Sequence, residues 1–468
     1  MKNISKLILA VVITQFLNCQ NDEEQYIVVD SNLKPETGEE YSGGQATKFN
    51  TSEEAFGFAV NNLTADEESD FGVGNSLFRQ SWVSSPASTT ARDGLGPFFN
   101  ANACASCHFK DGRGRPPAFD GEMSRGLLLR LSIAGSHANG SSFSDPIYGG
   151  QLQDNAILGQ VVKGKYATNY QTITETLADG STVSLQKPNY TFNNLGYGSL
   201  AAGLLVSPRI ANQIIGLGLL EAVPESTILA FATANTANGV SGKANYVYDV
   251  ESNAQKMGRF GWKANQPSIR QQVAGAFSGD MGITTSIFPI ENAPPGVNLA
   301  QIPNGGAPEI PNVNFDKVVV YSSALAVPAR RNFDQQNVLK GKQIFNDIAC
   351  ANCHIPKMQT GSSYSIAALR NQTIRPYTDM LLHDMGNDLA DNAPDFLATG
   401  NEWRTPPLWG IGLINVVNKH TNLLHDGRAR NIEEAILWHG GEGLYAKNKY
   451  KQLSVAQRSD LLSFLNSL

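Results

Sequence analysis

The sequence predicts a mainly α-helical protein of two related domains, the first of which carries a large loop- and β-rich insertion. The chain has 468 residues, more than one ordinary domain holds. The pattern C-x-x-C-H occurs at residues 104–108 and again at residues 350–354. Hydrophobic residues make up 41% and charged residues 17% of the chain, values of globular proteins that exclude a disordered chain.

The charge and hydropathy of the chain exclude further classes. The formal net charge is −6, and no basic run is longer than a pair. Neither nucleic acid nor an anionic membrane face is therefore expected as the main partner. Only the N-terminus is apolar enough to reach a bilayer, which excludes a multi-span membrane protein.

The first residues predict an export signal. Lys2 and Lys6 precede an apolar stretch, residues 7–17, that is too short to cross a bilayer. The stretch ends near Cys19, which resembles the lipobox of bacterial lipoproteins, where the cysteine carries the lipid. We expect a lipoprotein signal peptide over residues 1–19 and an anchor in the bacterial outer membrane, facing the periplasm or the cell surface. An ordinary secretory signal with an incidental cysteine is the alternative.

The four remaining cysteines all lie in the two C-x-x-C-H motifs, as Cys104, Cys107, Cys350 and Cys353. This motif is the attachment signature of a c-type haem. Two thiols three residues apart add to the vinyl groups of one porphyrin, and the next residue, His108 or His354, places its imidazole under the iron. The sequence therefore predicts two covalently bound haem c groups.

Three other uses of the cysteines fit less well. A zinc ribbon would not need a histidine after each pair and rarely separates its pairs this far. A thioredoxin-like dithiol would need a βαβ context. Structural disulfides suit an exported protein but would leave both histidines unexplained.

Composition along the chain defines the expected domains. Residues 20–55 are polar and rich in Glu, Thr and Ser, which is typical of a flexible tether. An N-terminal cytochrome c-like haem domain should follow over residues 56–316, and residues 141–200 within it alternate like short strands between turns. Prolines crowd residues 288–316, so we place the domain boundary there and a C-terminal cytochrome c-like haem domain over residues 317–468.

Helical signals flank the second motif. Residues 337–345 have an amphipathic helical pattern, and residues 454–468 fit a closing helix. In cytochromes c, a glycine and a following aromatic residue, here Gly341 and Phe345, let these two helices cross closely. Downstream of each motif lies one copy of a faint internal repeat. The copies are residues 215–223 and 409–417.

Several segments resemble the bacterial di-haem cytochrome c peroxidase superfamily. Its T-P-x-L, F-H-D-G, T-L-E-E-A and D-x-x-F-H-N-x-G elements have counterparts at residues 404–408, 424–427, 431–435 and 379–386. Residues 93–100, 112–117, 258–262 and 439–442 are similar to the narrower di-haem oxidoreductase family, which holds peroxidase-type and thiol-oxidoreductase-like proteins. The resemblance extends from about residue 55 to residue 468, and it implies a peroxidase-type oxidoreductase.

The resemblance also implies ligands for the second iron. In the peroxidases the distal ligand follows the L-E-E-A helix, and that position here is His439. We expect ligation by His354 and His439, with a helix cap or a propionate contact as the alternative for His439. A histidine in place of the family's methionine should lower the haem's potential. His383 and His425 are expected beside the haem, as partners of the ligands or propionates.

The first iron has no matching distal ligand. Met123, 15 residues after His108, is a candidate, and His137 is a weaker one. We prefer an open or labile sixth position, which peroxide or oxygen chemistry needs. Breaking an O–O bond also needs an acid–base group. Glu221 is the candidate, and a surface ion pair is its alternative.

Further residues have expected supporting roles. Arg113 and Arg115 should contact propionates or solvent. Trp262 should relay electrons between the haems, or else only pack in the core. In the related peroxidases, carbonyl groups near the T-P-x-L segment hold Ca²⁺, which makes Thr405 and Pro407 the expected calcium site.

The expected function is that of an exported peroxidase-type oxidoreductase. A small electron-donor protein or a quinol-linked donor would feed the C-terminal haem, and hydrogen peroxide or another small substrate would react at the N-terminal haem. The alternative is a non-catalytic electron-transfer lipoprotein in a respiratory or metal-reduction chain. Oxidation by a protein dithiol is disfavoured because haem attachment uses all four motif cysteines, whereas an external thiol or thiosulfate donor stays open.

Overall fold

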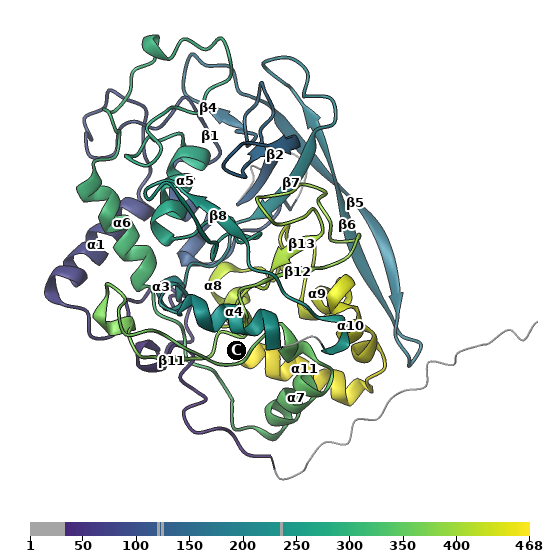
Figure 1. Cartoon of the computed structure of the whole chain (residues 1–468). Coiled ribbons are helices and arrows are strands. Elements are labelled where there is room, and N and C mark those ends of the chain that lie inside the picture. Colours follow the sequence, from purple (N-terminus) through teal and green to yellow (C-terminus); the bar gives the residue numbers. More distant parts are fainter. Residues whose placement is uncertain (1–32, 119–121, 123–125, 235–236) are drawn as a thin grey trace, which may run out of the picture.

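The structure, a computed structural model, describes residues 33–118, 122, 126–234 and 237–468. The expected signal peptide with Cys19, and Met123, lie outside the described residues. Figure 1 shows the larger strands at the upper right of the molecule and helices α7 and α11 at the bottom. No helix in the described part of the chain is long and apolar enough to cross a membrane.

The prediction of a mainly α-helical fold of two cytochrome c-like domains was wrong. Helices hold 29% of the residues and strands 19%. Two separate cytochrome c-like domains are not shown, because one of the two largest buried clusters combines residues from Ala46 to Val417. The boundary expected between residues 316 and 317 falls inside helix α6. The helical signals around the motifs were local, whereas the shared core depends on contacts between distant segments.

Two helix pairs are built alike. Helix α1 (Ala65–Arg79), which begins with a capping box, crosses α6 (Asn312–Ala324) at Gly74, where a Cβ atom would lie 2.1 Å from the Lys317 carbonyl oxygen. Helix α7 (Gln336–Asp347) crosses α11 (Val455–Ser467) at Gly341, where a Cβ atom would lie 2.0 Å from the Asp460 carbonyl oxygen. The predicted close crossing of the helices around the second motif is confirmed.

The internal repeat is confirmed in three dimensions. Gly218 lies in helix α3 (Leu217–Glu221) and packs against the Ser323 carbonyl of α6, with 2.3 Å from an added Cβ atom to that oxygen. Gly412 lies in the short 3₁₀ helix Ile411–Leu413 and meets the Asn466 carbonyl of α11 in the same way, at 2.0 Å. The first repeat copy therefore packs on α6, the helix that crosses α1, and the second copy packs on α11, the helix that crosses α7.

The strands form small antiparallel sheets. Strand β2 (Leu127–Ser136) lies between β3 (Ser142–Phe143) and β7 (Leu205–Ile210). The other pairs are β1 (Phe98–Phe99) with β4 (Asn155–Ala156), β8 (Tyr246–Asp249) with β9 (Ala254–Met257), β10 (Met358–Gln359) with β11 (Thr373–Ile374), and β12 (Leu382–Asp384) with β13 (Glu402–Arg404). The remaining helices are α2 (Cys104–Cys107), α4 (Glu225–Ala234), α5 (Ile269–Met281), α8 (Ile414–Asn418), α9 (Ile432–Leu437) and α10 (Leu444–Lys451).

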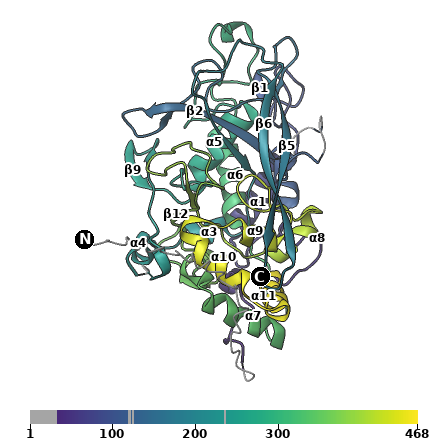
Figure 2. The same ribbon diagram turned by 90° about the vertical axis from the view of Figure 1, so that its right-hand side faces the viewer.

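A long hairpin of strands β5 (Lys165–Thr176) and β6 (Thr182–Asn193) replaces the short strands expected in the insertion. Both views show it running along the molecule toward the C-terminal helices (Figures 1 and 2). Glu175 pairs with Lys447 and Lys451 of α10 at 2.7 and 2.9 Å. The hairpin thus ties the insertion to the end of the chain.

The segment before α1 also differs from the expected tether. Glu39 is buried and forms ion pairs with Arg330 and with Lys342, the latter at 2.7 Å. Ala46 and Ala55 are buried in the core cluster that extends from Ala46 to Val417. Where it is described, this segment packs on the body of the protein, because its few apolar residues and one buried acid find partners in the C-terminal half.

Candidate functional site

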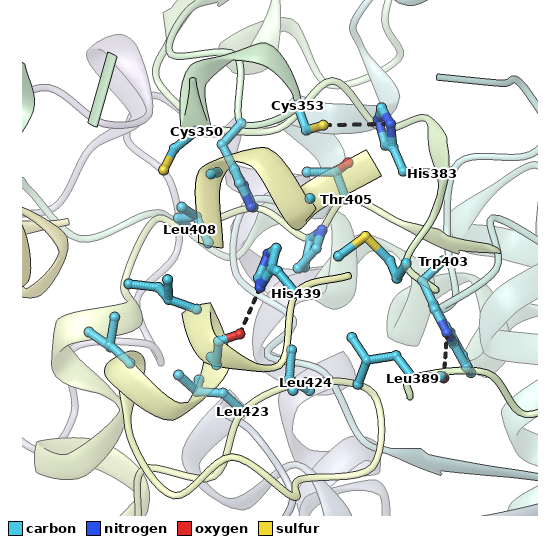
Figure 3. Close-up of a pocket in the computed structure, with 18 of the residues that line it drawn as sticks. Cys350, Cys353, His383, Leu389, Trp403, Thr405, Leu408, Leu423, Leu424 and His439 are labelled. Atoms are coloured by element: carbon cyan, nitrogen blue, oxygen red, sulfur yellow. Dashed lines mark hydrogen bonds between the residues drawn. The ribbon is translucent and has the colours of Figure 1, made fainter. Parts of the chain in front are cut away.

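The second C-x-x-C-H motif faces a mostly apolar pocket (Figure 3). The pocket holds about 1460 Å³ of space, part of it open to solvent. Cys350 and Cys353 both line it, and their sulfurs are not joined in a disulfide. Its wall includes the apolar side chains Leu389, Trp403, Leu408, Leu423 and Leu424.

Two partly buried imidazoles line this pocket, and each turns its Nδ1 toward a backbone carbonyl. Nδ1 of His354 lies 2.9 Å from the Tyr377 carbonyl oxygen, and Nδ1 of His439 lies 2.7 Å from the Ala435 carbonyl oxygen. A carbonyl only accepts, so each Nδ1 donates its proton and each Nε2 keeps a lone pair. Burial lowers the pKa of His354 to about 4 and also lowers that of His439. Both rings are therefore neutral, as metal ligation requires.

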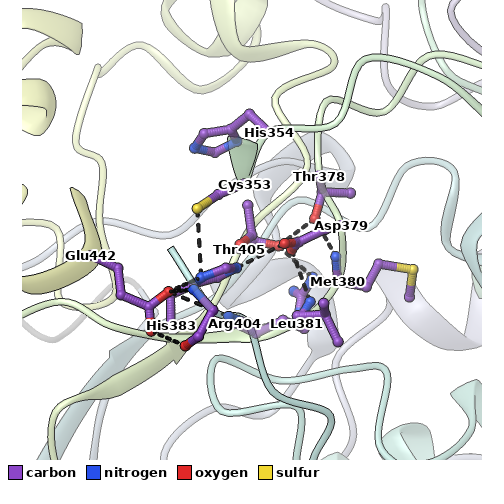
Figure 4. Close-up of polar contacts among 12 residues, drawn as sticks. Cys353, His354, Thr378, Asp379, Met380, Leu381, His383, Arg404, Thr405 and Glu442 are labelled. Carbon is purple, nitrogen blue, oxygen red and sulfur yellow. Dashed lines mark hydrogen bonds and ion pairs between the residues drawn. The ribbon is translucent and has the colours of Figure 1, made fainter. Parts of the chain in front are cut away.

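His383 lies at the edge of this pocket in a buried ionic cluster (Figure 4). Its Nε2 donates to Asp379 at 2.8 Å and its Nδ1 to Glu442 at 2.6 Å, with the Cys353 sulfur 3.5 Å away. Burial alone would lower its pKa, but the hydrogen bonds, that to Asp379 foremost, raise the pKa to about 12. His383 is thus a cation held between two carboxylates and beside Cys353.

Stacked aromatic rings form one wall of the second pocket. His425 lies flat on Trp403, with ring centroids 3.8 Å apart, and meets Trp262 edge-on at 6.5 Å. Burial lowers the pKa of His425 to about 4. Its ring is thus engaged in aromatic contacts with Trp403 and Trp262.

The first C-x-x-C-H motif faces a larger pocket with a more polar lining. It holds about 2120 Å³ of space, again partly open to solvent. Cys104 and Cys107 line it without a disulfide between them. His108 repeats the orientation of the other motif, because its Nδ1 lies 2.7 Å from the Asn212 carbonyl oxygen. Burial lowers its pKa, so this Nε2 also offers a lone pair.

The first pocket lacks a counterpart of His439. Among the described residues that line it, His108 is the only histidine and no tyrosine is present. Met281 lies beside the attachment cysteine instead, with its sulfur 3.9 Å from the Cys104 sulfur. His137 lies outside this pocket and packs edge-on against Phe143.

Glu221, the acid–base candidate from sequence, does not line this pocket. Its carboxylate accepts hydrogen bonds from the Ile269 N–H at 2.7 Å and from the Tyr364 hydroxyl at 2.6 Å. It therefore helps to hold the start of α5. Instead of Glu221, the pocket wall contains Arg130 and Asp280.

Sequence reasoning missed these two residues. Asp280 is the penultimate residue of α5, and nothing in its local sequence marks it. Arg130 left a signal that was overlooked, since it interrupts the apolar run Leu127–Leu131 of a strand whose alternate residues are buried.

Trp262 and Arg113 connect the two pockets, since both residues line each of them. The indole N–H of Trp262 donates to the Ile210 carbonyl at 2.8 Å, and the Arg113 guanidinium lies 5.0 Å from the centre of its ring system. Burial lowers the pKa of Arg113 to about 10, and its Nε has no partner in the described part of the chain. A buried cation with a free donor suits a haem propionate. Arg115 instead pairs with Glu122.

The expected calcium site finds no support in these contacts. The Thr405 carbonyl accepts hydrogen bonds from the Thr378 hydroxyl at 2.6 Å and from the Arg404 guanidinium at 3.2 Å. A cationic donor on that oxygen disfavours a second cation there. Pro407 lines both pockets.

The residues present fit two haem groups. Each pocket brings together two unpaired thiols and one neutral imidazole with a free Nε2, the donor set of a C-x-x-C-H site. Burial raises the pKa of Cys104 and of Cys350 to about 12, so neither is a thiolate at neutral pH. A shared zinc site does not fit, because the two cysteine pairs line different pockets.

Comparison with known families agrees with this donor set. The family model described as "Di-haem oxidoreductase, putative peroxidase" matches residues 37–468. The chain belongs to this family. The family name implies two haem groups and an oxidoreductase activity. No curated protein matches the chain.

Proposed function

We propose that this member of the di-haem oxidoreductase family is a peroxidase-type enzyme whose two haem sites have different duties. The observation that carries the proposal is the difference between the pockets. The second pocket holds two neutral imidazoles, His354 and His439, whereas the described lining of the first holds one, His108. A closed iron suits electron storage, and an open iron suits binding of a small oxidant such as hydrogen peroxide.

The chain's own residues would attach and orient the cofactors. The motif cysteines would form the thioether bonds, and the two carbonyl-bound Nδ1 groups would fix the proximal imidazoles. When bound, the haem groups supply the redox chemistry. Trp262, which lines both pockets, is the proposed electron relay between them, and Arg113 would bind a propionate.

The cellular setting is proposed from the sequence. Export by the N-terminal signal, with lipid attachment at Cys19, would bring the protein to the compartment in which c-type haem is attached. A small electron-donor protein or a quinol-linked donor would then supply the second haem.

Electron paramagnetic resonance of the oxidised, haem-loaded protein tests the proposal. The spectrum is recorded before and after adding one electron and then hydrogen peroxide. We expect one low-spin signal and one high-spin signal, the latter consumed by peroxide. Two low-spin signals that neither reduction nor peroxide changes would refute the peroxidase function and indicate an electron carrier.

A further inference from the structure

The end of helix α5 brings an acid into the first pocket, next to the C-x-x-C-H motif. The Asp280 carbonyl accepts hydrogen bonds from the backbone N–H groups of Asn100 and Ala101 at 2.8 and 3.2 Å. The next residue, Met281, touches the Cys104 sulfur at 3.9 Å. Backbone bonds on one side and a sulfur contact on the other thus fix Asp280 relative to the motif.

The Asp280 carboxyl is held by a hydrogen bond, but no cation forms an ion pair with it in the described part of the chain. One oxygen accepts a hydrogen bond from the Gln151 side-chain amide at 2.9 Å. That amide is itself fixed by the Asn100 side-chain oxygen at 2.7 Å and the Gly279 carbonyl at 3.1 Å. Among the described residues the second carboxyl oxygen has no hydrogen-bond partner, and the carboxyl belongs to no ion pair.

Arg130 of strand β2 faces the same pocket. Within the described chain its guanidinium has neither a hydrogen-bond partner nor an ion pair. Asp280 is the opposite charge that acts on it most strongly, yet the two side chains do not form a salt bridge. An unpaired cation and an unpaired acid oxygen therefore line one polar cavity, an arrangement that stabilises charge in a small bound ligand.

We infer that Asp280 is the acid–base residue of the first haem pocket and that Arg130 stabilises the anionic form of the bound oxidant. This inference rests on the proposed function, because it presumes an open iron at His108. It replaces Glu221, whose two carboxylate oxygens are already engaged at the start of α5.

The overall reaction is H₂O₂ + 2 H⁺ + 2 e⁻ → 2 H₂O, with both electrons from the external donor. Asp280 accepts the proton of one peroxide oxygen and returns it to the other. The O–O bond then breaks, and its electron pair leaves with the protonated oxygen as water. The remaining oxygen becomes the second water by taking up two protons and the two electrons. Arg130 offsets the negative charge while the peroxide is deprotonated.

Ligand binding to the oxidised, haem-loaded protein tests the inference without turnover. Hydrogen cyanide must lose its proton to bind iron, so an acid–base residue speeds its association. We expect Asp280→Asn, which keeps an oxygen for Gln151, to slow cyanide association about 100-fold. Arg130→Leu should weaken fluoride binding about 10-fold or more, as expected for loss of a charged hydrogen bond. Glu221→Gln is the matched control and should change neither quantity.

The outcomes separate the two proposals. Failure of the wild-type protein to bind cyanide and fluoride would refute the open iron and the proposed function. Normal wild-type binding that Asp280→Asn and Arg130→Leu leave unchanged would overturn only the inference. Unchanged fluoride binding with a shifted midpoint potential in Arg130→Leu would assign that arginine to a propionate instead. If Asp280→Asn does not take up haem, Asp280→Glu, which keeps a carboxyl group, should retain cyanide association within about 10-fold, and a greater loss would count against the acid–base role.

Discussion

The crossing of α1 and α6 can be tested with two glycines of one helix. Gly72 and Gly74 both lie in α1, but a Cβ atom on Gly72 would meet no atom within 4 Å. A Cβ atom on Gly74 would lie 2.1 Å from the Lys317 carbonyl oxygen and 2.8 Å from the Tyr321 Cβ atom. The same substitution at these two positions should therefore have opposite effects on stability.

The size of the effect follows from these distances. Ordinary van der Waals contact begins at 3.4 Å, so Gly74→Ala forces the helices apart by 3.4 − 2.1 = 1.3 Å at this point. Because the obstacle is backbone, the cost should fall at the upper end of the usual range for overpacking, about 3 kcal/mol. Alanine has a higher helix propensity than glycine, which offsets about 1 kcal/mol of this cost. The net loss is about 2 kcal/mol, whereas Gly72→Ala should gain up to about 1 kcal/mol.

Scanning calorimetry of the haem-loaded variants measures both changes. At roughly 2 °C per kcal/mol for a protein of this size, Gly74→Ala should lower Tm by about 4 °C. Gly72→Ala should leave Tm unchanged or slightly raised. Equal Tm values for the two variants would show that the helices do not cross closely at Gly74. They would also refute the equivalence of the α1–α6 and α7–α11 pairs.

Two further predictions concern the second haem site and the pH dependence of stability. His439→Met in the haem-loaded protein should raise the midpoint potential of the second haem, because methionine ligation favours the reduced iron; an unchanged potential and spectrum in a redox titration would remove His439 as a ligand. Burial, together with the facing Glu309 carboxyl, raises the pKa of Glu291 from its ordinary 4.5 to about 8. The folded chain then holds a proton that the unfolded chain releases, so stability should fall as pH rises from about 4.5 to 8. Glu291→Gln should flatten the fall of Tm between pH 5 and pH 8, and an unchanged slope would exclude Glu291 as its cause.

Short-range patterns predicted the parts of the site that sit close together in sequence. The C-x-x-C-H spacing brings two thiols and an imidazole to each pocket because one turn of chain places them there. The helix around Gly341 was visible from its amphipathic pattern, and the closing helix begins with a capping box at Ser454 and Gln457. His439 was reached through family resemblance, and it lines the same pocket as the motif histidine His354.

The fold class and the acid of the first pocket were not predictable in this way. The core shared between both halves depends on contacts between segments hundreds of residues apart, and the long hairpin pairs two 12-residue strands where shorter strands were expected. Asp280 and Arg130 share one cavity only because helix α5 and strand β2 both line it. Glu221 was chosen for its place in the repeat. One of its carboxylate oxygens accepts a hydrogen bond from Tyr364, which lies 143 residues away in the sequence.

The β5–β6 hairpin has a consequence for how such a chain is made and inherited. It is encoded between the two cysteine motifs, yet it rests on α10 and on Arg458 of α11, the last helices to be synthesised. The hairpin therefore cannot form these ion pairs until the C-terminal helices have been synthesised. A chain that kept only the first motif would lose the helices that pair with the hairpin, and a chain that kept only the second would lose the hairpin itself. Selection should therefore preserve the two halves together in one chain.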